Sequence, residues 1–164
     1  MSIRRSTTEV GMHPFTDVAA PSVTETALAD LVQSFYAKVR RDELIGSLFN
    51  SAIDDWPTHL EKLTRFWSSI MLTSGSYKGN PMAAHTKHAA DITPDMFSRW
   101  LALWAETTAE VFAPEDAERL QGKARHIARS LMMALEFHAG QSSRLSAGQG
   151  TVIDAYQGED RARG

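Results

Sequence analysis

The sequence predicts an all-α protein, and three observations lead to this prediction. Apolar residues recur at three- and four-residue steps in several long segments, and residues typical of helix starts stand in front of them. No segment alternates convincingly between apolar and polar residues as a strand would. The chain has 164 residues, of which 43% are hydrophobic, so we expect one domain with a substantial core.

The first apolar stripe predicts a helix near the N-terminus of the domain. Either Thr24 or Thr26 could cap this helix, because a threonine oxygen can accept from the free N–H groups of a first turn. Residues 42–50, which come next, indicate a turn or a short helical piece. The apolar face of the first helix consists of Leu28, Leu31, Val32, Phe35, Tyr36 and Val39.

A second long helix is expected to begin at Asp54 or Asp55. It should stop at Thr73-Ser-Gly75, and the following residues, 74–81, form a loop by their turn chemistry. A brief helix from Pro81 to about Ala89 follows. The apolar face of the long helix consists of Trp56, Leu60, Leu63, Phe66, Trp67, Ile70 and Met71.

Two more helices complete the predicted domain. Thr93-Pro94-Asp95 combines a cap, a first-turn proline and an acid at the positive end of the helix dipole. Ala113-Pro114-Glu115-Asp116 opens the last and longest helix, for which Gly140 is the expected stop. The apolar faces of these helices are Phe97, Trp100, Leu101, Trp104 and Val111, and then Leu120, Ala124, Ile127, Ala128, Leu131 and Leu135.

The ends of the chain differ from its middle. Residues 1–21 and 141–164 are polar or rich in glycine and lack apolar periodicity, so flexible tails are expected on either side of a domain at 22–140. No apolar run approaches the roughly 18 residues of a membrane span. The basic N-terminus is followed by no apolar stretch, so no secretory signal is predicted and the cytoplasm is the expected compartment.

Charge and cysteine content exclude several classes of function. The net charge is -3 with no basic block, which disfavours nucleic-acid binding. The chain contains no cysteine, so disulfides, thiolate zinc sites, iron–sulfur clusters and covalent haem attachment are excluded. Any haem must be bound non-covalently, with His, Met or Tyr as the protein ligand of the iron.

Two histidines stand in contrasting surroundings. His59 follows Trp56 on the aromatic-rich helix and precedes Phe66, whereas His85 lies after a turn on a short segment with little apolar surface. Two imidazoles placed in this way could clamp a flat apolar cofactor with a central metal, which points to haem. The main alternative is a cofactor-free helical interaction domain, because an aromatic stripe at helical spacing usually belongs to a core.

A series of motifs strengthens the haem interpretation through its order and spacing. The motifs are Phe35-Tyr36-x-x-Val39, Leu48-Phe49-Asn50, Trp56-Pro-x-His59-Leu, Phe66-Trp67-Ser-Ser, Tyr77-Lys-Gly-Asn-Pro-Met-x-x-His85, Phe97-x-x-Trp100-Leu-Ala-Leu-Trp104 and Glu106-Thr-Thr-Ala-Glu. Together they resemble the truncated haemoglobins, specifically their third group, and the similarity runs from about residue 26 to residue 138. The resemblance implies a truncated globin fold, in which a two-on-two helical sandwich surrounds non-covalent haem b.

The resemblance also implies a role for each matching side chain. His85 resembles the proximal ligand of the iron, with its second ring nitrogen donating a hydrogen bond. Tyr36 and Trp100 match distal positions whose O–H and N–H groups reach a ligand of the iron, and His59 matches a distal histidine that gates the pocket. Further contacts with the cofactor are implied for Phe35, Leu63, Phe66 and Trp67.

These roles imply tight ligand binding. Hydrogen bonds from Tyr36 and Trp100 to oxygen would each contribute about 1.5–3 kcal/mol, which together is roughly a hundredfold or more in affinity. Such retention suits redox chemistry on O2, NO or peroxide better than bulk oxygen transport. A NO dioxygenase- or peroxidase-like activity would match it, in a monomer that works with an unidentified reductase and has no nucleic-acid or membrane partner.

The sequence leaves some alternatives open. His88 stands three residues after His85, and the segment lacks the Leu and Pro expected behind the ligand, so His88 is a possible competing iron ligand. A haem-based gas sensor that signals through its tails is another alternative, although the tails resemble no output module. Candidate cations for the haem propionates are Lys62, Arg65, Lys78 and Arg99.

Overall fold

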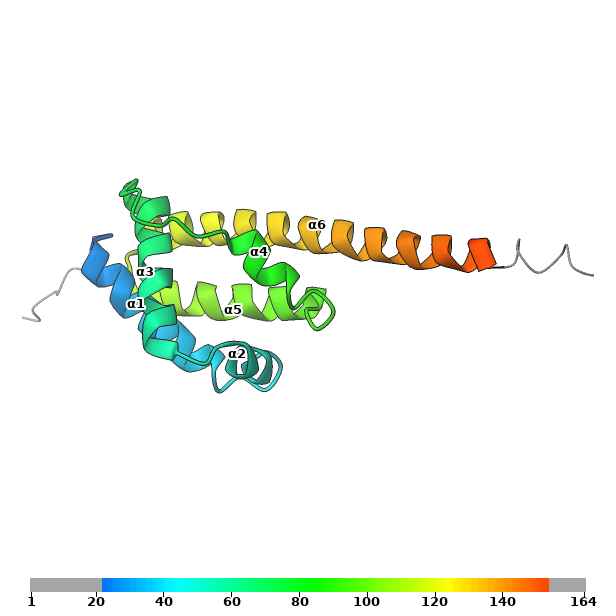
Figure 1. Ribbon diagram of the computed structural model, residues 1–164. Coiled ribbons are helices and arrows are strands. Elements are labelled where there is room, and N and C mark those ends of the chain that lie inside the picture. Colours follow the sequence, from blue (N-terminus) through cyan, green and yellow to red (C-terminus); the bar gives the residue numbers. More distant parts are fainter. Residues whose placement is uncertain (1–21, 154–164) are drawn as a thin grey trace, which may run out of the picture.

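The computed structural model of the protein describes the backbone of residues 22–153 and the side chains of residues 22–144. The helices in this part of the chain are α1 (Glu25–Val39), α2 (Gly46–Ala52), α3 (Trp56–Leu72), α4 (Pro81–Thr86), α5 (Pro94–Val111) and α6 (Pro114–Ile153). No strand occurs between residues 22 and 153, and the predicted all-α class is confirmed (Figure 1). The expected N-terminal tail at 1–21 lies outside the described residues. Of the expected C-terminal tail at 141–164, residues 141–153 continue α6 and residues 154–164 lie outside the described part.

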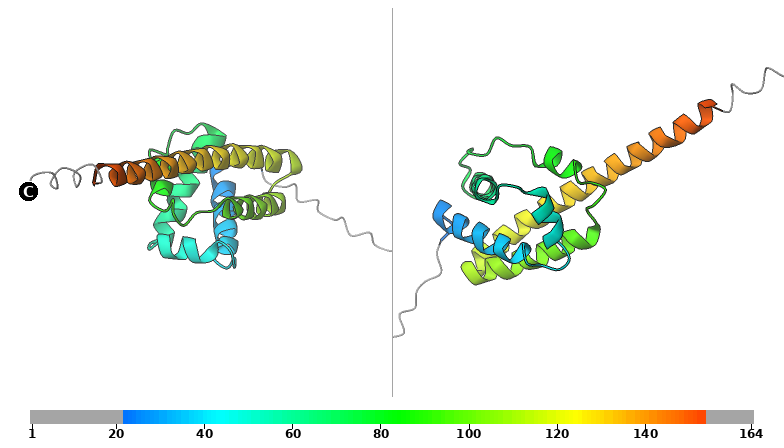
Figure 2. Two further views of the ribbon diagram at one scale, coloured as in Figure 1. Left: turned by 90° about the vertical axis from the view of Figure 1, so that its right-hand side faces the viewer. Right: turned by 60° about the horizontal axis from the view of Figure 1, so that its bottom comes forward.

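Two helix pairs form the two layers of the molecule. α1 packs on α3, α5 packs on α6, and α1 joins the pairs by also packing on α5. The short helix α4 rests on α6, and the far end of α6 projects beyond the other helices in both views of Figure 2. This arrangement is the predicted two-on-two sandwich. None of the helices between residues 22 and 153 has the length and apolar character required to cross a membrane.

Side-chain caps begin four of the helices and settle two alternatives left open by the sequence. The capping pairs are Thr24 Oγ1 with the N–H of Ala27 at 3.2 Å, Asp55 Oδ1 with Thr58 at 3.1 Å, Asn80 Oδ1 with Ala83 at 3.1 Å and Thr93 Oγ1 with Met96 at 3.4 Å. The caps are therefore Thr24, not Thr26, and Asp55, not Asp54. Each one satisfies an N–H group that the first helical turn cannot pair internally.

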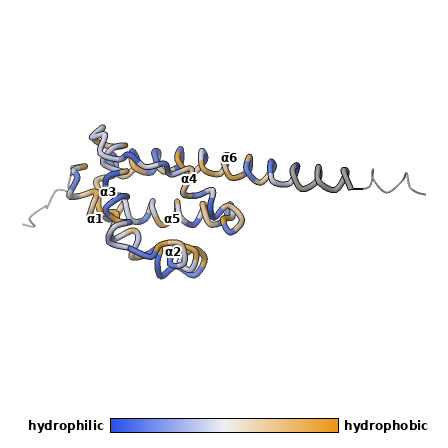
Figure 3. Tube along the Cα trace, viewed as in Figure 1, coloured by the Kyte–Doolittle hydropathy of each residue, from blue (hydrophilic) through white to orange (hydrophobic). Residues whose placement is uncertain are grey.

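Aromatic rings from three helices form the centre of the core. Trp67 of α3 stacks on Trp104 of α5 with ring centroids 4.3 Å apart, and Phe35 of α1 meets Trp104 edge-on at 4.9 Å. All three side chains are fully or almost fully buried. The amphipathic helices that surround them show the alternation of hydrophobic and hydrophilic positions that the sequence pattern predicts (Figure 3).

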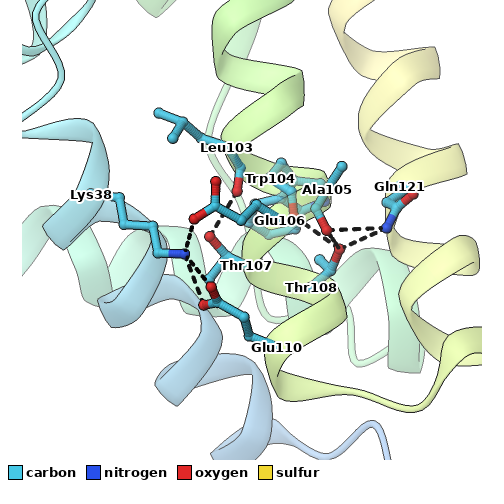
Figure 4. Close-up of polar contacts among 9 residues, drawn as sticks. All are labelled: Lys38, Leu103, Trp104, Ala105, Glu106, Thr107, Thr108, Glu110 and Gln121. Carbon is cyan, nitrogen blue, oxygen red and sulfur yellow. Dashed lines mark hydrogen bonds and ion pairs between the residues drawn. The ribbon is translucent and has the colours of Figure 1, made fainter.

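Polar contacts fix α5 against both of its neighbours (Figure 4). Lys38 Nζ of α1 lies 2.7 Å from Glu106 Oε1 and 2.8 Å from Glu110 Oε2. On the opposite side of α5, Gln121 Nε2 of α6 donates to Thr108 Oγ1 at 3.0 Å. The motif that begins at Glu106 therefore supplies polar contacts both to α1 in the other layer and to α6 in its own layer.

Two predicted helix ends differ from the structure. The brief helix α4 ends at Thr86 and not near Ala89; turn hydrogen bonds, such as the 3.0 Å contact from the N–H of His88 to the carbonyl of His85, follow it. The predicted stop at Gly140 is wrong, because α6 continues to Ile153. Gly140 does not adopt a positive φ, and with no proline after it in the helix, it costs only about 1 kcal/mol there.

One ion pair ties α5 to the loop between α1 and α2. Arg99 Nε donates to Asp42 Oδ2 at 2.7 Å, and the Asp42 side chain is only 7% exposed. Burial alone would raise the pKa of Asp42, but hydrogen bonds from Arg99 and from two backbone N–H groups of the loop outweigh burial and lower this pKa. The stabilisation is therefore present above the unfolded pKa of about 3.9 and is lost as the pH falls through the lower folded pKa.

Replacement of Asp42 should reveal how much the Asp42–Arg99 ion pair contributes to the free energy of unfolding. We expect Asp42→Asn to lower the free energy of unfolding at pH 7 by about 1–2 kcal/mol, because a charge-assisted hydrogen bond is lost. The variant should also lose less stability than the wild type between about pH 4 and pH 2. Urea unfolding across this range measures both effects. The control is Asp30→Asn, which removes an exposed carboxylate of α1; equal losses in the two variants would contradict the prediction.

Candidate functional site

The phenol of Tyr36 lies inside a group of aromatic rings contributed by three helices. Tyr36 is on the inner face of α1 and is 4% exposed. Its ring lies 5.8 Å from that of Phe49 in α2, 6.0 Å from Trp56 and 6.1 Å from His59, the last two in α3. The Tyr36 hydroxyl is therefore buried among mostly apolar rings and is shielded from water.

This environment keeps the phenol protonated. Burial raises the pKa of Tyr36 far above its ordinary value, and hydrogen bonding with Trp100 reverses only part of that rise. The desolvated side chain is neutral because burial disfavours the phenolate. Tyr36 therefore remains an O–H donor at every physiological pH.

Trp100 approaches this site from α5. Its ring is parallel to that of Trp104, with centroids 5.8 Å apart and an interplanar angle of 3°, and it meets Phe35 edge-on at 5.4 Å. These buried neighbours hold the indole in one orientation, while its outer part remains partly exposed. The structure thus brings the phenol of Tyr36 and the indole of Trp100 together, because the two side chains are hydrogen-bonded.

His59 stands at the edge of the same group, and its ring is partly exposed. Burial is the main cause that lowers the pKa of His59, and electrostatic interactions with Lys62 and His85 lower this pKa further. The imidazole is therefore neutral at pH 7.

His85 is held by its own short helix. The Asn80 cap and Pro81 begin α4, and one turn later the Nδ1 atom of His85 lies 2.7 Å from the carbonyl oxygen of Pro81. A carbonyl can only accept, so Nδ1 carries the proton and, in the neutral ring, Nε2 keeps a free lone pair. This is the tautomer that a metal-ligating histidine needs.

Partly buried apolar side chains come from the stretch of chain between the two histidines and from α5. Leu63, Phe66 and Leu101 pack against the core and keep exposed surface, and Tyr77 of the loop before α4 covers Phe66 with ring centroids 5.2 Å apart. These residues offer an apolar surface beside a single imidazole, and this combination fits haem. Between residues 22 and 144, no three histidine or carboxylate side chains converge to form a metal site by themselves.

The remaining predicted residues are two core aromatics, a second histidine and four candidate partners of the haem propionates. Phe35 is 0% and Trp67 1% exposed, so both lie within the core, behind the partly exposed side chains. His88 falls in the turn after α4. Among the predicted propionate partners, Arg99 pairs with Asp42 and Arg65 with Glu61. Lys62 and Lys78 form no ion pair with any described side chain.

Two residues of this site were not assigned to it from the sequence. Trp56 contacts both Tyr36 and His59, and Tyr77 covers Phe66. A signal for Trp56 was available, since it precedes His59 by three residues and therefore shares a face of α3 with it. Tyr77 lies in a loop, for which helical periodicity gives no information.

Two helix pairs that enclose such a site are the architecture of a truncated globin. The sequence profile of the family described as "Bacterial-like globin" matches residues 23–136. A group 3 truncated haemoglobin of Campylobacter jejuni is 30% identical over 126 residues, which cover 73% of this chain and 96% of that protein. The crystal structure of a group III truncated haemoglobin from Campylobacter jejuni matches with a TM-score of 0.64 and 30% identity, over 72% of this chain and 95% of that one.

The chain therefore belongs to the bacterial-like globins, as a group III truncated haemoglobin. It is a haem-binding globin, and globins bind diatomic ligands such as O2. The match to the family covers most of α1 to α6 and includes both histidines, Tyr36 and Trp100.

Proposed function

We propose that the protein binds haem b non-covalently, with His85 as the protein ligand of the iron, and serves redox chemistry on O2, NO or peroxide more than bulk oxygen transport. The observation that carries this proposal is the pair of donors, the O–H of Tyr36 and the N–H of Trp100. The Tyr36 hydroxyl is desolvated and the Trp100 indole is partly buried against Trp104. In surroundings of low polarity, a hydrogen bond to a partly anionic ligand is stronger than in water. We expect the protein to act as a cytoplasmic monomer supplied with electrons by a reductase.

The residues of the chain divide the work between the two sides of the cofactor. When bound, haem supplies an iron centre that takes up a diatomic ligand and exchanges electrons with it. The carbonyl of Pro81 fixes the tautomer and orientation of His85. Tyr36 and Trp100 would donate hydrogen bonds to a ligand of the iron, and the neutral His59 would stand at the edge of the pocket that holds this ligand. Leu63 and Phe66 exclude water.

His85 is a better candidate than His88 for the proximal ligand. The Nδ1 proton of His85 is engaged by Pro81 one turn earlier on the same helix, which leaves the second nitrogen free to bind a metal. His88 lies beyond the end of α4, where no regular helix supports it. Phe35 and Trp67 are best understood as supports behind the pocket, because their rings have almost no exposed surface.

The oxygen dissociation rate of Tyr36→Phe tests the proposed distal role. We expect this rate to rise at least tenfold, because one charge-assisted hydrogen bond corresponds to about 1.5–3 kcal/mol. Stopped-flow displacement of O2 by carbon monoxide measures it. Tyr77→Phe is the matched control, since it also removes one tyrosine hydroxyl and leaves the ring that contacts Phe66 in place. An unchanged rate in Tyr36→Phe would contradict the proposed role, and purified protein that gives no Soret band with hemin would favour the cofactor-free alternative.

A further inference from the structure

Three rings form a closed contact group at the start of α3. The centroid distances are 6.0 Å between Tyr36 and Trp56, 6.1 Å between Tyr36 and His59, and 5.9 Å between Trp56 and His59. Because each ring touches the other two, none can turn without displacing a neighbour. The orientation of His59 therefore depends on the position of Trp56, which is the first residue of α3 and is partly exposed.

An arginine covers the outer face of this group. The guanidinium carbon of Arg40 lies 4.6 Å from the ring centroid of Trp56, which is a cation–π contact. Arg40 follows Tyr36 by one helical turn, and its backbone is fixed at both ends. Its N–H donates to the carbonyl of Tyr36 at 3.0 Å, and its carbonyl accepts from Asn50 Nδ2 at 3.0 Å.

The guanidinium has no competing partner in the part of the chain that the structure describes. Arg40 forms no ion pair with any side chain of residues 22–144, and its neighbour Arg41 forms none either. Both arginines lie beside a surface groove that they line together with Asn50, Ile53 and Trp56. Only Arg40 is placed over the indole, so the two residues share a charge and a location but not the ring contact.

We propose that Arg40 is a positioning residue for the distal pocket: by stacking on Trp56, it holds the His59 ring against Tyr36. Its effect passes from α1 through one indole to the imidazole, and Arg40 itself contacts no ligand. If ligands of the iron enter past Tyr36, Trp56 and His59, Arg40 also affects the rate of ligand entry. This consequence rests on the proposed function. The alternative is that the two arginines only offset the negative end of the α1 dipole. In that case Arg40 and Arg41 are equivalent, and their replacement should have the same effect.

Three variants separate these two roles in the haem-loaded protein. Arg40→Gln removes the cation and the contact, Arg41→Gln removes the same charge at the same helix end, and Arg40→Lys keeps a cation over the ring. We expect Arg40→Gln to raise the association rate of carbon monoxide about two- to fivefold, the factor that corresponds to an exposed cation–π contact. Arg41→Gln should leave the association rate unchanged. Arg40→Lys should give a rate close to that of the wild type, because it keeps a cation over the ring.

A second measurement reads the position of His59 directly. The imidazole resonances of His59 carry ring-current shifts from Trp56 and Tyr36, and NMR spectra of the reduced, carbon-monoxide-saturated protein should show these shifts shrinking in Arg40→Gln but not in Arg41→Gln. Equal effects of the two glutamine variants, or none in Arg40→Gln, would overturn the proposal. If the wild type takes up no haem, the proposed function fails, and the His59 resonances of the protein as purified still decide the role of Arg40.

Discussion

His85→Gly is expected to lose the haem complex. The structure supplies one imidazole with a free Nε2 lone pair on this side of the site, and the residue that replaces it offers no ligand. We expect haem affinity to fall by roughly a hundredfold or more. Loss of a residue that only hydrogen-bonds to a metal ligand already lowers metal affinity about 10–100-fold, and here the ligand itself is removed. Titration of the purified protein with hemin, followed at the Soret band, measures the loss. Added imidazole should restore the band, because it can occupy the space of the missing ring.

The neighbouring histidine provides the control for this prediction. His88→Gly should bind hemin as the wild type does, because His88 lies in the turn beyond α4. The opposite ranking, with His88→Gly losing the Soret band and His85→Gly keeping it, would assign the iron to the other histidine. An unaltered band in the double variant would show that neither one is the ligand.

Trp104→Ala should destabilise the protein more than any other single truncation in the core. The indole is 0% exposed, stacks on Trp67 and donates from Nε1 to the carbonyl of Leu120 at 3.3 Å. Loss of a large buried aromatic side chain costs about 3–5 kcal/mol in transfer and cavity terms. That is a large share of a typical stability of about 5–15 kcal/mol. Urea unfolding should therefore show a much lower midpoint.

An exposed aromatic residue on α6 serves as the comparison for Trp104. Phe137 is 65% exposed, so Phe137→Ala should change the free energy of unfolding by no more than about 0.5 kcal/mol. Trp104→Phe, which keeps a ring in the stack and loses the Nε1 donor, should fall between the two. Similar losses in Trp104→Ala and Phe137→Ala would contradict the assigned core.

Periodicity and caps were enough to predict the order of the helices, whereas their packing into two layers was implied only by the resemblance to the truncated haemoglobins. They could not tell which residues line the cofactor surface and which lie behind it. Phe35 and Trp67 share apolar stripes with Tyr36 and Phe66, and spacing along a helix identifies a face but not the neighbour that covers it. The crossing of α1, α3 and α5 decides that Phe35 and Trp67 meet Trp104 and stay in the core.

The sequence was also ambiguous where two nearby residues could both cap the same helix. The sequence could not choose between Thr24 and Thr26 as a cap, because both have a suitable oxygen and only the helix phase selects one. Gly140 was expected to end α6, but a glycine ends a helix only when the chain turns there, and nothing after Gly140 makes it turn. The contact of Arg40 with Trp56 depends on tertiary packing, so no local pattern signals it.

The small size of α4 has a consequence for how this protein assembles. A helix of six residues (Pro81–Thr86) is far below the roughly 12–15 residues that hold together in water by themselves, so α4 depends on its cap and on its seat against α6. A bond from His85 to iron would fasten this segment from its other side. Taking up the cofactor and ordering this corner of the chain should thus be one linked event, with amide hydrogens around residues 81–91 exchanging much more slowly once hemin is added.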